Sequence, residues 1–386
     1  MPLILTLPPQ SATHPGAIQH GGHTVISTTV FPGRYVQGMD SRKRLARELS
    51  RFGKNGVVIC GPLVHETVLP DFKPYLQNDV HLRIEKFGGE CSDEEIERLM
   101  SLINQGKFDF VVGLGGGKTL DTAKAVAYET GLPVAVVPTI AATDAPCSAL
   151  SVIYTPAGEF KRYFMLPRNP DLVLVDTQIV ANAPVRFLVS GMGDAMATWF
   201  EAESCMKNRA PNMAGDVGSM SAYALARLCY DTVLRYGSTA KTACEAHVVT
   251  PALERIVEAN TLLSGLGFES GGLAASHAIH NGLTVLEETH QSYHGEKVAF
   301  GTLTSLFLTD RPIETINEVY GFCESIGLPS TLADIGLAEA RDEDLLKVAT
   351  ASCLEGETIH NEPIPVTPDL VFSALKAADA EGRRRR

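Results

Sequence analysis

Closely spaced cysteine pairs are absent from this chain of 386 residues. Its eight cysteines lie far apart, so neither a Cys-x-x-Cys motif nor zinc-finger spacing occurs, and we expect reduced, mostly buried thiols. The sequence also lacks an apolar run long enough to span a membrane and shows no signal or transit peptide pattern. These absences favour a cytoplasmic enzyme. Residues 1–22, which are rich in Pro, Gly, Gln and His, are expected to form a flexible extension.

Positive charge is scarce as well. Lys and Arg number 33 against 45 Asp and Glu, which gives a formal net charge of −12 and argues against binding to nucleic acid or to an anionic membrane. The basic cluster at residues 383–386 is interpreted as a solvated, mobile end of the chain. The length allows two domains of ordinary size, each with its own core.

What the sequence does have is a glycine-rich turn. An apolar stretch at residues 108–112 is followed by four glycines within residues 113–117, and a helical pattern begins at once. The P-loop template requires a glycine where Val112 stands, and the common dinucleotide fingerprint requires one where Lys118 stands. The turn is therefore predicted to hold a phosphate by another pattern, with Lys118 suited to a pyrophosphate. Tight packing of strand on helix is the alternative reason for these glycines.

The first half of the chain alternates strand-like and helix-like segments, which predicts an α/β domain with a parallel, Rossmann-like sheet covered by helices on both faces. Ligands of such sheets bind at the carboxyl ends of the strands, where the glycine turn falls. Ser92 and Glu95 predict a capping box at the start of one helix. The expected strands are residues 24–30, 57–60, 81–87, 108–112 and 133–138, and the expected helices are residues 41–52, 65–76, 93–104 and 117–129.

After a pair of short strands at residues 151–155 and 161–165 and a strand at 172–175, strand signals nearly vanish. An all-helical second domain is predicted for residues 185–386, following a dinucleotide-binding domain at 23–184. The helices expected in it are residues 185–205, 213–236, 241–265, 270–285, 296–308, 312–326 and 342–354.

Four histidines fall within eighteen residues of the helical part: His277, His280, His290 and His294. Neutral histidine is a common ligand of zinc or iron, and three protein ligands with one open position make a catalytic site. An oxygen ligand could come from Asp194, which follows two glycines in an otherwise apolar helix and needs a partner if buried. A helix cap is the alternative role of Asp194, and an ordinary core or surface role is the alternative for each histidine.

The loop at residues 138–148 follows the strand after the glycine turn, so it should open on the same edge of the sheet. Thr139, Asp144 and Ser148 could reach hydroxyl groups of a cofactor or substrate, or could simply form a hydrogen-bonded turn. Cys147 has no base supplied by its neighbours, so it is interpreted as a packing residue.

Together these segments resemble the glycerol dehydrogenases, a group within the superfamily of metal-dependent alcohol dehydrogenases of the iron-containing type. The resemblance covers nearly the whole chain and implies the two-domain fold of dehydroquinate synthase. It also implies a reversible, NAD- and zinc-dependent oxidation of glycerol to dihydroxyacetone, by hydride transfer from a metal-bound secondary alcohol of a vicinal diol, and a homo-oligomer that is often an octamer. The stretches that carry the resemblance are residues 32–38, 87–91, 115–124, 143–154, 193–194, 269–275, 294–301 and 355–361.

The resemblance assigns roles residue by residue. The implied metal ligands are Asp194, His277 and His294. The implied cofactor-binding residues are Gly115, Gly116, Gly117 and Lys118 at the pyrophosphate, with Thr139, Ser148, Leu150 and Tyr154 toward the nicotinamide. Asp144 falls where the family contacts substrate, and His280 and His290 are left without a ligand role.

Two departures from the family pattern concern the cofactor. Family members commonly carry an acidic residue that binds the adenosine ribose where this chain has Cys60-Gly61, which weakens the expected preference for NAD over NADP. Ala142 stands where a serine is usual, which removes one hydrogen bond that the cofactor could receive.

Two other functions are compatible with this architecture. A lyase similar to dehydroquinate synthase would need several extra Lys and Arg for a phosphate-bearing substrate, but residues 191–202 and 269–296 contain none. A polyol-binding protein without catalytic activity would be expected to have lost a metal ligand or the glycine turn, and both are kept.

Overall fold

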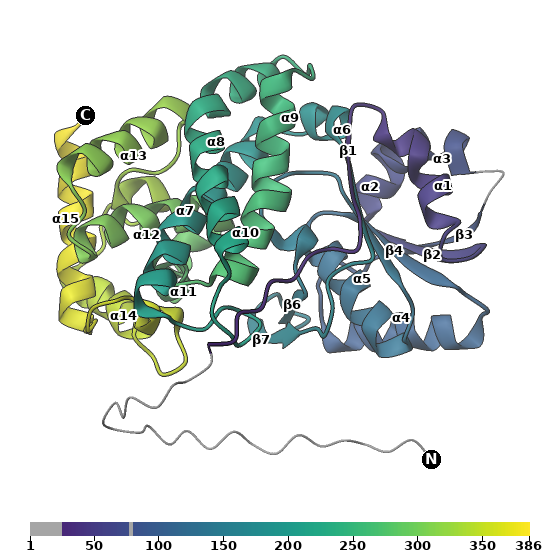
Figure 1. Cartoon of the computed structure of the whole chain (residues 1–386), viewed down its shortest axis with the longest axis horizontal. Helices are drawn as coiled ribbons and strands as arrows, with labels where there is room; N and C mark the ends of the chain where they lie inside the picture. Colours follow the sequence, from purple (N-terminus) through teal and green to yellow (C-terminus); the bar gives the residue numbers. More distant parts are fainter. Residues whose placement is uncertain (1–24, 77–79) are drawn as a thin grey trace.

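The structure, a computed structural model, describes residues 25–76 and 80–386, so the extension predicted at residues 1–22 lies outside the described part. A sheet of six strands, all paired in parallel, forms one end of the molecule, and helices form the other (Figure 1). The strand order is β1-β8-β5-β4-β2-β3. The strands are β1 (Tyr35–Gly38), β2 (Asn55–Cys60), β3 (His81–Lys86), β4 (Phe110–Gly115), β5 (Val134–Pro138) and β8 (Leu172–Asp176).

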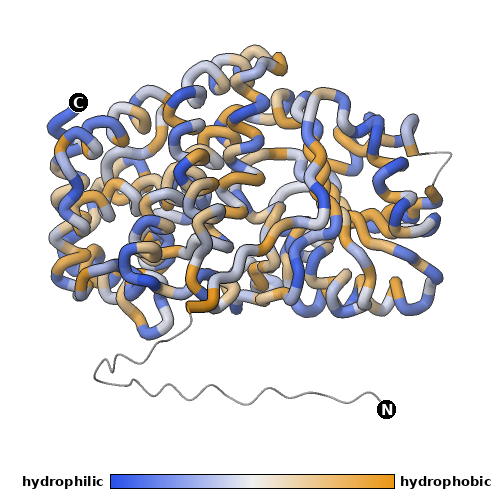
Figure 2. The backbone as a smooth tube through the Cα atoms, viewed as in Figure 1, coloured by the Kyte–Doolittle hydropathy of each residue, from blue (hydrophilic) through white to orange (hydrophobic). Residues whose placement is uncertain are grey.

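Both faces of this sheet are buried, as expected for parallel strands. In β4, Val111 belongs to a core cluster with Leu99 of α4 (Asp93–Gln105), whereas its neighbour Val112 belongs to a second cluster with Phe72 of α3 (Leu69–Leu76). Figure 2 shows the resulting concentration of hydrophobic residues along the strands. The helices of this part are α1 (Leu45–Leu49), α2 (Pro62–Thr67), α3 (Leu69–Leu76), α4 (Asp93–Gln105), α5 (Gly117–Thr130) and α6 (Thr177–Asn182).

From Val185 onward the described chain is helical, which confirms the predicted combination of an α/β part and an all-α part. One cluster of buried apolar side chains runs from Val57 in the sheet to Ala378 in the last helix, so the two parts share a core. None of the described helices is both long and apolar enough to cross a membrane. The helices are α7 (Val185–Asn208), α8 (Met220–Glu245), α9 (Pro251–Glu258), α10 (Ser264–Gly271), α11 (Ala275–Leu283), α12 (His294–Leu308), α13 (Ile313–Ile326), α14 (Asp342–Ser352) and α15 (Pro368–Arg384).

Between the two parts, β6 (Leu150–Tyr154) and β7 (Phe160–Met165) form the predicted pair of short strands, an antiparallel ribbon. The predicted capping box of α4 is only half formed. The Ser92 hydroxyl accepts the Glu95 N–H at 3.3 Å, but the Glu95 carboxylate accepts the Gly88 N–H at 2.9 Å instead of returning to Ser92.

The strand predicted at residues 24–30 is wrong, because its described residues lie outside the sheet. They run along the helical part, where Ser27 forms an isolated bridge with Val217 and the Thr28 hydroxyl donates to Asp216 at 2.7 Å. The first sheet strand is β1 at residues 35–38. A short β-branched stretch fits any extended chain, and nothing local specifies its partner.

The single helix predicted at residues 65–76 is wrong, since α2 ends at Thr67 and α3 begins at Leu69. In the helical part, three helix predictions misplaced their ends. Residues 213–236 and 241–265 were expected as helices, but α8 starts only after the capping Ser219 and runs on to Glu245, and Pro251 then starts α9. Residues 270–285 were expected as one helix, but Gly272 has φ of 104°, which ends α10 before α11 begins.

The basic residues 383–386 are not a free end, since α15 reaches Arg384 and had been missed altogether. Arg383 pairs with Asp379 at 2.8 Å and Arg385 pairs with Glu381 at 2.7 Å, both at i,i+4 spacing. Acidic partners one turn earlier therefore hold the arginines on the helix.

Candidate active site

The glycine turn joins β4 to α5, with Gly116 as the N-cap of the helix. Its glycines divide into two groups. A β-carbon at Gly113 would lie 2.7 Å from the Ala123 side chain, so this glycine permits tight packing of strand on helix. A β-carbon at Gly117 would meet no atom within 4 Å, because Gly115, Gly116 and Gly117 line an open cavity. Packing and ligand access thus both account for the glycine run.

The cavity has a volume of about 590 Å³, which is within the usual range for small-molecule sites. The α/β part contributes the glycine turn, the loop after β5 and the β6–β7 ribbon. The helical part contributes residues of α7, α11 and α12. The predicted site residues that line it are Gly115, Gly116, Gly117, Lys118, Asp144, Ser148, Leu150, Tyr154, His277 and His294.

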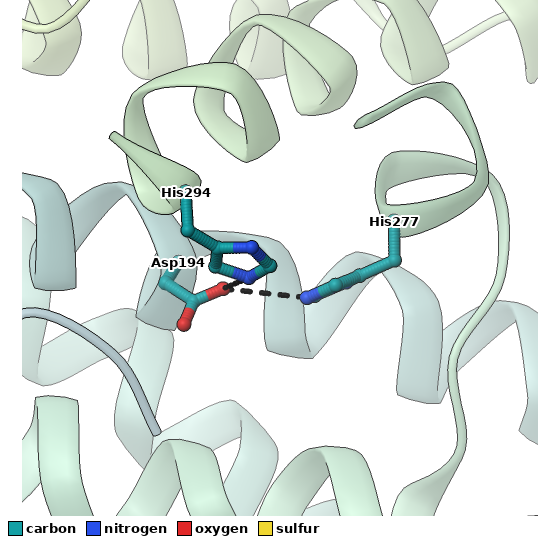
Figure 3. A group of neighbouring side chains, drawn as sticks. All are labelled: Asp194, His277 and His294. Atoms are coloured by element: carbon teal, nitrogen blue, oxygen red, sulfur yellow. Dashed lines mark ion pairs between the residues drawn. The ribbon is translucent and has the colours of Figure 1, made fainter. Parts of the chain in front are cut away.

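Asp194, His277 and His294 meet at the helical side of this cavity (Figure 3). Asp194 is fully buried on α7, and its Oδ1 lies 3.3 Å from the Nε2 atoms of both histidines. That oxygen has no hydrogen bond of proper geometry. A buried carboxylate oxygen without a partner is costly, and a cation held between it and two imidazoles would remove that cost. The residues therefore fit a metal ion.

Glycines bring the ligands together. A β-carbon at Gly193 would lie 2.4 Å from the Gly295 carbonyl oxygen, and one at Gly295 would lie 1.9 Å from that of Ser190. The backbones of α7 and α12 can therefore approach only because both positions are glycine. Asp194 follows the first glycine and His294 precedes the second, so this contact places the two candidate ligands side by side.

Glu201, which the sequence analysis missed, orients His277. It lies on α7 seven residues after Asp194, and its Oε2 accepts the His277 Nδ1–H at 2.6 Å. Its Oε1 accepts the backbone N–H groups of Ala274 and His277, each at 2.9 Å. Because Nδ1 donates to Glu201, Nε2 is the ring nitrogen that faces Asp194 and that can bind a metal once it carries no proton. The sequence signal that could have identified Glu201 is its position as an acidic residue in an apolar helix, two turns after Asp194.

The charged groups of the site shift one another's pKa values. Burial opposes a charged His277, but the Glu201 and Asp194 carboxylates raise its pKa well above the usual value, so a proton competes with a metal at Nε2. Burial would raise the pKa of Asp194, but the two histidines lower it far below the usual range. The pKa of Asp144 shifts in the opposite direction from that of Asp194, because burial and the Asp194 charge raise it well above the usual value.

Asp144 lies next to the metal-ligand group. Its backbone N–H donates to Asp194 Oδ2 at 3.3 Å, and its own Oδ2 accepts the Ser264 hydroxyl at 3.0 Å. Thr139 is the one predicted cofactor residue that is not among the cavity-lining residues; its N–H donates to the Gly115 carbonyl at 3.0 Å and braces the glycine turn.

Lys118 stands at the opposite end of the cavity, where its Nζ lies 2.6 Å from both carboxylate oxygens of Glu90 and 4.9 Å from the Tyr154 ring centre. His280 packs against His294, with ring centres 4.3 Å apart, and His290 bonds to the Thr284 carbonyl. Neither belongs to the group of three residues whose potential ligand atoms lie within 4.8 Å of one another.

Two buried residues brace the cavity wall. Lys124 is fully buried, and its Nζ lies 2.9 Å from Asp121 Oδ1 and donates to the Ala145 carbonyl at 3.0 Å. Sequence spacing could have revealed the i,i+3 pair with Asp121 inside α5, and the bond to the Ala145 carbonyl ties α5 to the loop that carries Ser148. Cys147 is fully buried and burial raises its pKa, which fits a packing residue.

The chain is similar to known proteins in both sequence and structure. The profile of the family described as iron-containing alcohol dehydrogenase matches residues 32–177. The glycerol dehydrogenase of Thermotoga maritima is 66% identical, over 94% of this chain and 99% of that protein. The glycerol dehydrogenase of Citrobacter freundii is 53% identical, over 92% and 97%. The solved structure of glycerol dehydrogenase from Schizosaccharomyces pombe is 40% identical with a TM-score of 0.89, covering 94% of this chain and 92% of that one.

Proposed function

Because the chain belongs to the glycerol dehydrogenases of the iron-containing alcohol dehydrogenase family and is an oxidoreductase, we propose that it oxidises glycerol to dihydroxyacetone reversibly, with NAD and Zn²⁺. The observation that carries the proposal is the Asp194 Oδ1 atom, buried without a hydrogen bond and facing two histidine nitrogens across one cavity from a glycine turn. The cytoplasmic location and the octameric assembly remain predictions.

Asp194, His277 and His294 would hold the metal. Two imidazoles and one carboxylate leave open positions, an arrangement known for catalytic zinc and for non-haem iron. We favour zinc, because hydride transfer requires no change in the oxidation state of the metal. When bound, the ion supplies Lewis acidity toward an alcohol oxygen.

The protein's own groups would align the reactants. The N–H groups at the start of α5 would receive the pyrophosphate, and the wall formed by Ser148, Leu150 and Tyr154 would hold the nicotinamide toward the metal ligands. Phe187 and Phe268 line the same cavity and limit water around the reacting carbon. Fixing cofactor and alcohol in one enclosed site supplies the orientation that hydride transfer needs.

A neutral polyol also fits the charges of the cavity. Lys118 is its only lining Lys or Arg within the described chain, and Glu90 already pairs with that ammonium. A phosphate-bearing acid, the substrate class of the lyase alternative, would find no second strong cation there. We therefore do not propose the lyase function.

The test is NADH absorbance on mixing the purified protein with NAD and glycerol. We expect NADH formation that a chelator abolishes and that Zn²⁺ restores. 1,2-Propanediol should replace glycerol, and 1,3-propanediol, which lacks adjacent hydroxyls, should be a poor substrate. NADH formation that is unchanged after complete metal removal would overturn the metal assignment, and no reaction with any vicinal diol would overturn the function.

A further inference from the structure

The sheet order fixes where the adenosine half of a dinucleotide would lie. The strands are parallel, so β5, β4, β2 and β3 end in this sequence along one edge, with the glycine turn after β4. The loop carrying Ser148 follows β5 and leads to the metal-ligand group, so the nicotinamide would lie on the β5 side of the turn. The adenosine must then extend to the other side, over the ends of β2 and β3.

The end of β2 offers no carboxylate. In dinucleotide folds, an acidic residue after the strand beside the glycine turn binds the ribose hydroxyls and so selects NAD. Here Cys60 is fully buried and is followed by Gly61. Gly61 has φ of −66°, which any residue adopts, and a β-carbon there would meet no atom within 4 Å. The backbone at Gly61 could carry an acidic side chain, but glycine has none. The space beside Gly61 is therefore free.

The neighbouring strand places a cation at the same corner. Lys86, the last residue of β3, is paired in register with Cys60, so the two side chains lie on the same face. Burial raises the pKa of the Cys60 thiol and the Lys86 ammonium lowers it, which agrees with this proximity. Lys86 is exposed, and the described part of the chain gives it no ion pair.

The carboxylates around this corner are already neutralised. Glu90 is held by Lys118 at 2.6 Å. Glu95 is bound by Arg98 at 2.7 Å, and Glu85 is bound by Arg83 at 2.7 Å. Glu66 lies five residues beyond Gly61 on α2, about 7.5 Å further along the helix. Of these groups, Lys86 and Glu66 have no ion pair among the described residues, and Lys86 is the one in register with Cys60, next to Gly61. The unpaired charge beside the position expected for the ribose is therefore positive.

From this arrangement we propose that the corner at Gly61 and Lys86, beyond the glycine turn, accepts a phosphorylated ribose, so that the protein uses NADP and NADPH as well as NAD and NADH. Gly61 leaves room for the 2′-phosphate, and the Lys86 ammonium offsets its charge. The inference rests on the proposed function only in taking the cavity as a dinucleotide site. Hydride transfer is the same with either cofactor.

Fluorescence titration of the protein with NADH and with NADPH tests this without requiring turnover. For the unaltered protein we expect dissociation constants within about tenfold of each other. Gly61→Asp should weaken NADPH binding by at least roughly tenfold through like-charge repulsion, with little effect on NADH. Lys86→Ala should weaken NADPH binding about fivefold and make it less sensitive to salt. Lys107→Ala, an exposed lysine just before β4 at the opposite edge, is the matched control and should change neither.

Each outcome decides the inference. NADPH binding about a hundredfold weaker than NADH binding in the unaltered protein overturns it while leaving the proposed function standing. An unchanged NADPH-to-NADH ratio in both Gly61→Asp and Lys86→Ala overturns it as well, because the ribose then lies elsewhere. Similar binding of both cofactors without glycerol oxidation supports the inference and overturns the proposed function. Retained NADH binding shows that a variant is folded.

Discussion

The two ends of the cavity are built in different ways. At the metal end, Asp194 and Glu201 are buried on α7, at 0% and 1% exposure, and the partly exposed His277 and His294 reach them from two helices packed on α7. The nucleotide end consists mainly of backbone at the glycine turn, and its charged residue Lys118 has a side chain that is 43% exposed. The geometry of the metal end therefore depends on the tertiary packing of α7, α11 and α12, whereas that of the nucleotide end depends on one strand, one turn and one helix.

Glycine serves each end for a different reason. Gly193 and Gly295 fill the contact between α7 and α12, where no β-carbon fits. Gly117 borders open space, where a β-carbon meets no protein atom but would stand in the path of a ligand. The first pair shapes the folded protein, and the second kind of glycine matters only once the cofactor binds.

The largest effect is expected at the metal end. Replacing His277 or Asp194 with Ala should lower glycerol oxidation by at least about a thousandfold, because a ligand set of two residues no longer retains the metal that activates the alcohol. Far-ultraviolet circular dichroism should show a largely unchanged fold. A metal-free His277→Ala protein that oxidises glycerol at the parent rate would show that these residues do not form the metal site.

Paired alanine substitutions of glycine test the contrast between the ends most directly. Gly117→Ala should leave the thermal unfolding temperature unchanged or slightly higher, because alanine favours a helix, while NADH binding falls roughly ten- to a hundredfold. Gly193→Ala should destabilise the protein by about 1–3 kcal/mol, because its methyl group meets the Gly295 carbonyl. Calorimetry and NADH titration of both variants are the measurements. If the two variants lost stability equally, the distinction between the ends would be wrong.

Glu201→Gln should have an intermediate effect that is specific to metal retention. The amide oxygen can still accept the His277 Nδ1–H, but the amide carries no charge and its NH2 then faces the backbone N–H groups of Ala274 and His277. Zinc affinity should therefore fall roughly ten- to a hundredfold. Competition with a chromophoric chelator measures this affinity directly. Glu203→Gln, two residues along the same helix and paired with Lys207, is a matched control that should leave zinc affinity intact. Equal affinity for zinc in Glu201→Gln and the parent would remove Glu201 from the support of the site.

The sequence indicated local chemistry better than long-range contacts. The turn at residues 113–117 and the candidate ligands Asp194, His277 and His294 could be proposed from the sequence because each stands in a local pattern or in a recognisable family motif, and the structure brings the three candidate ligands together. The contact between Gly193 and Gly295 joins helices about a hundred residues apart, and no local sequence pattern around either glycine predicts it. The same reason explains the misplaced first strand, since the partner of Ser27 is Val217. Helix α15 was missed because its arginines were treated without their acidic partners at i−4.

Substitution of Lys118 has the smallest expected effect. It tests whether the nucleotide end contributes only to cofactor binding. Glu90 holds its ammonium at the cavity mouth, so pyrophosphate binding must share or displace that pair. Lys118→Ala should raise the KM for NAD by about fivefold and change kcat little, because an exposed cation contributes only about 1 kcal/mol of binding. Glu90→Gln should have the opposite sign and lower the KM for NAD, since it releases the ammonium without removing it. Steady-state kinetics at saturating glycerol separate the two constants. A fall in kcat with unchanged KM would place Lys118 in the chemistry of the bound complex, and the nucleotide end would then share the catalytic role assigned here to the metal end alone.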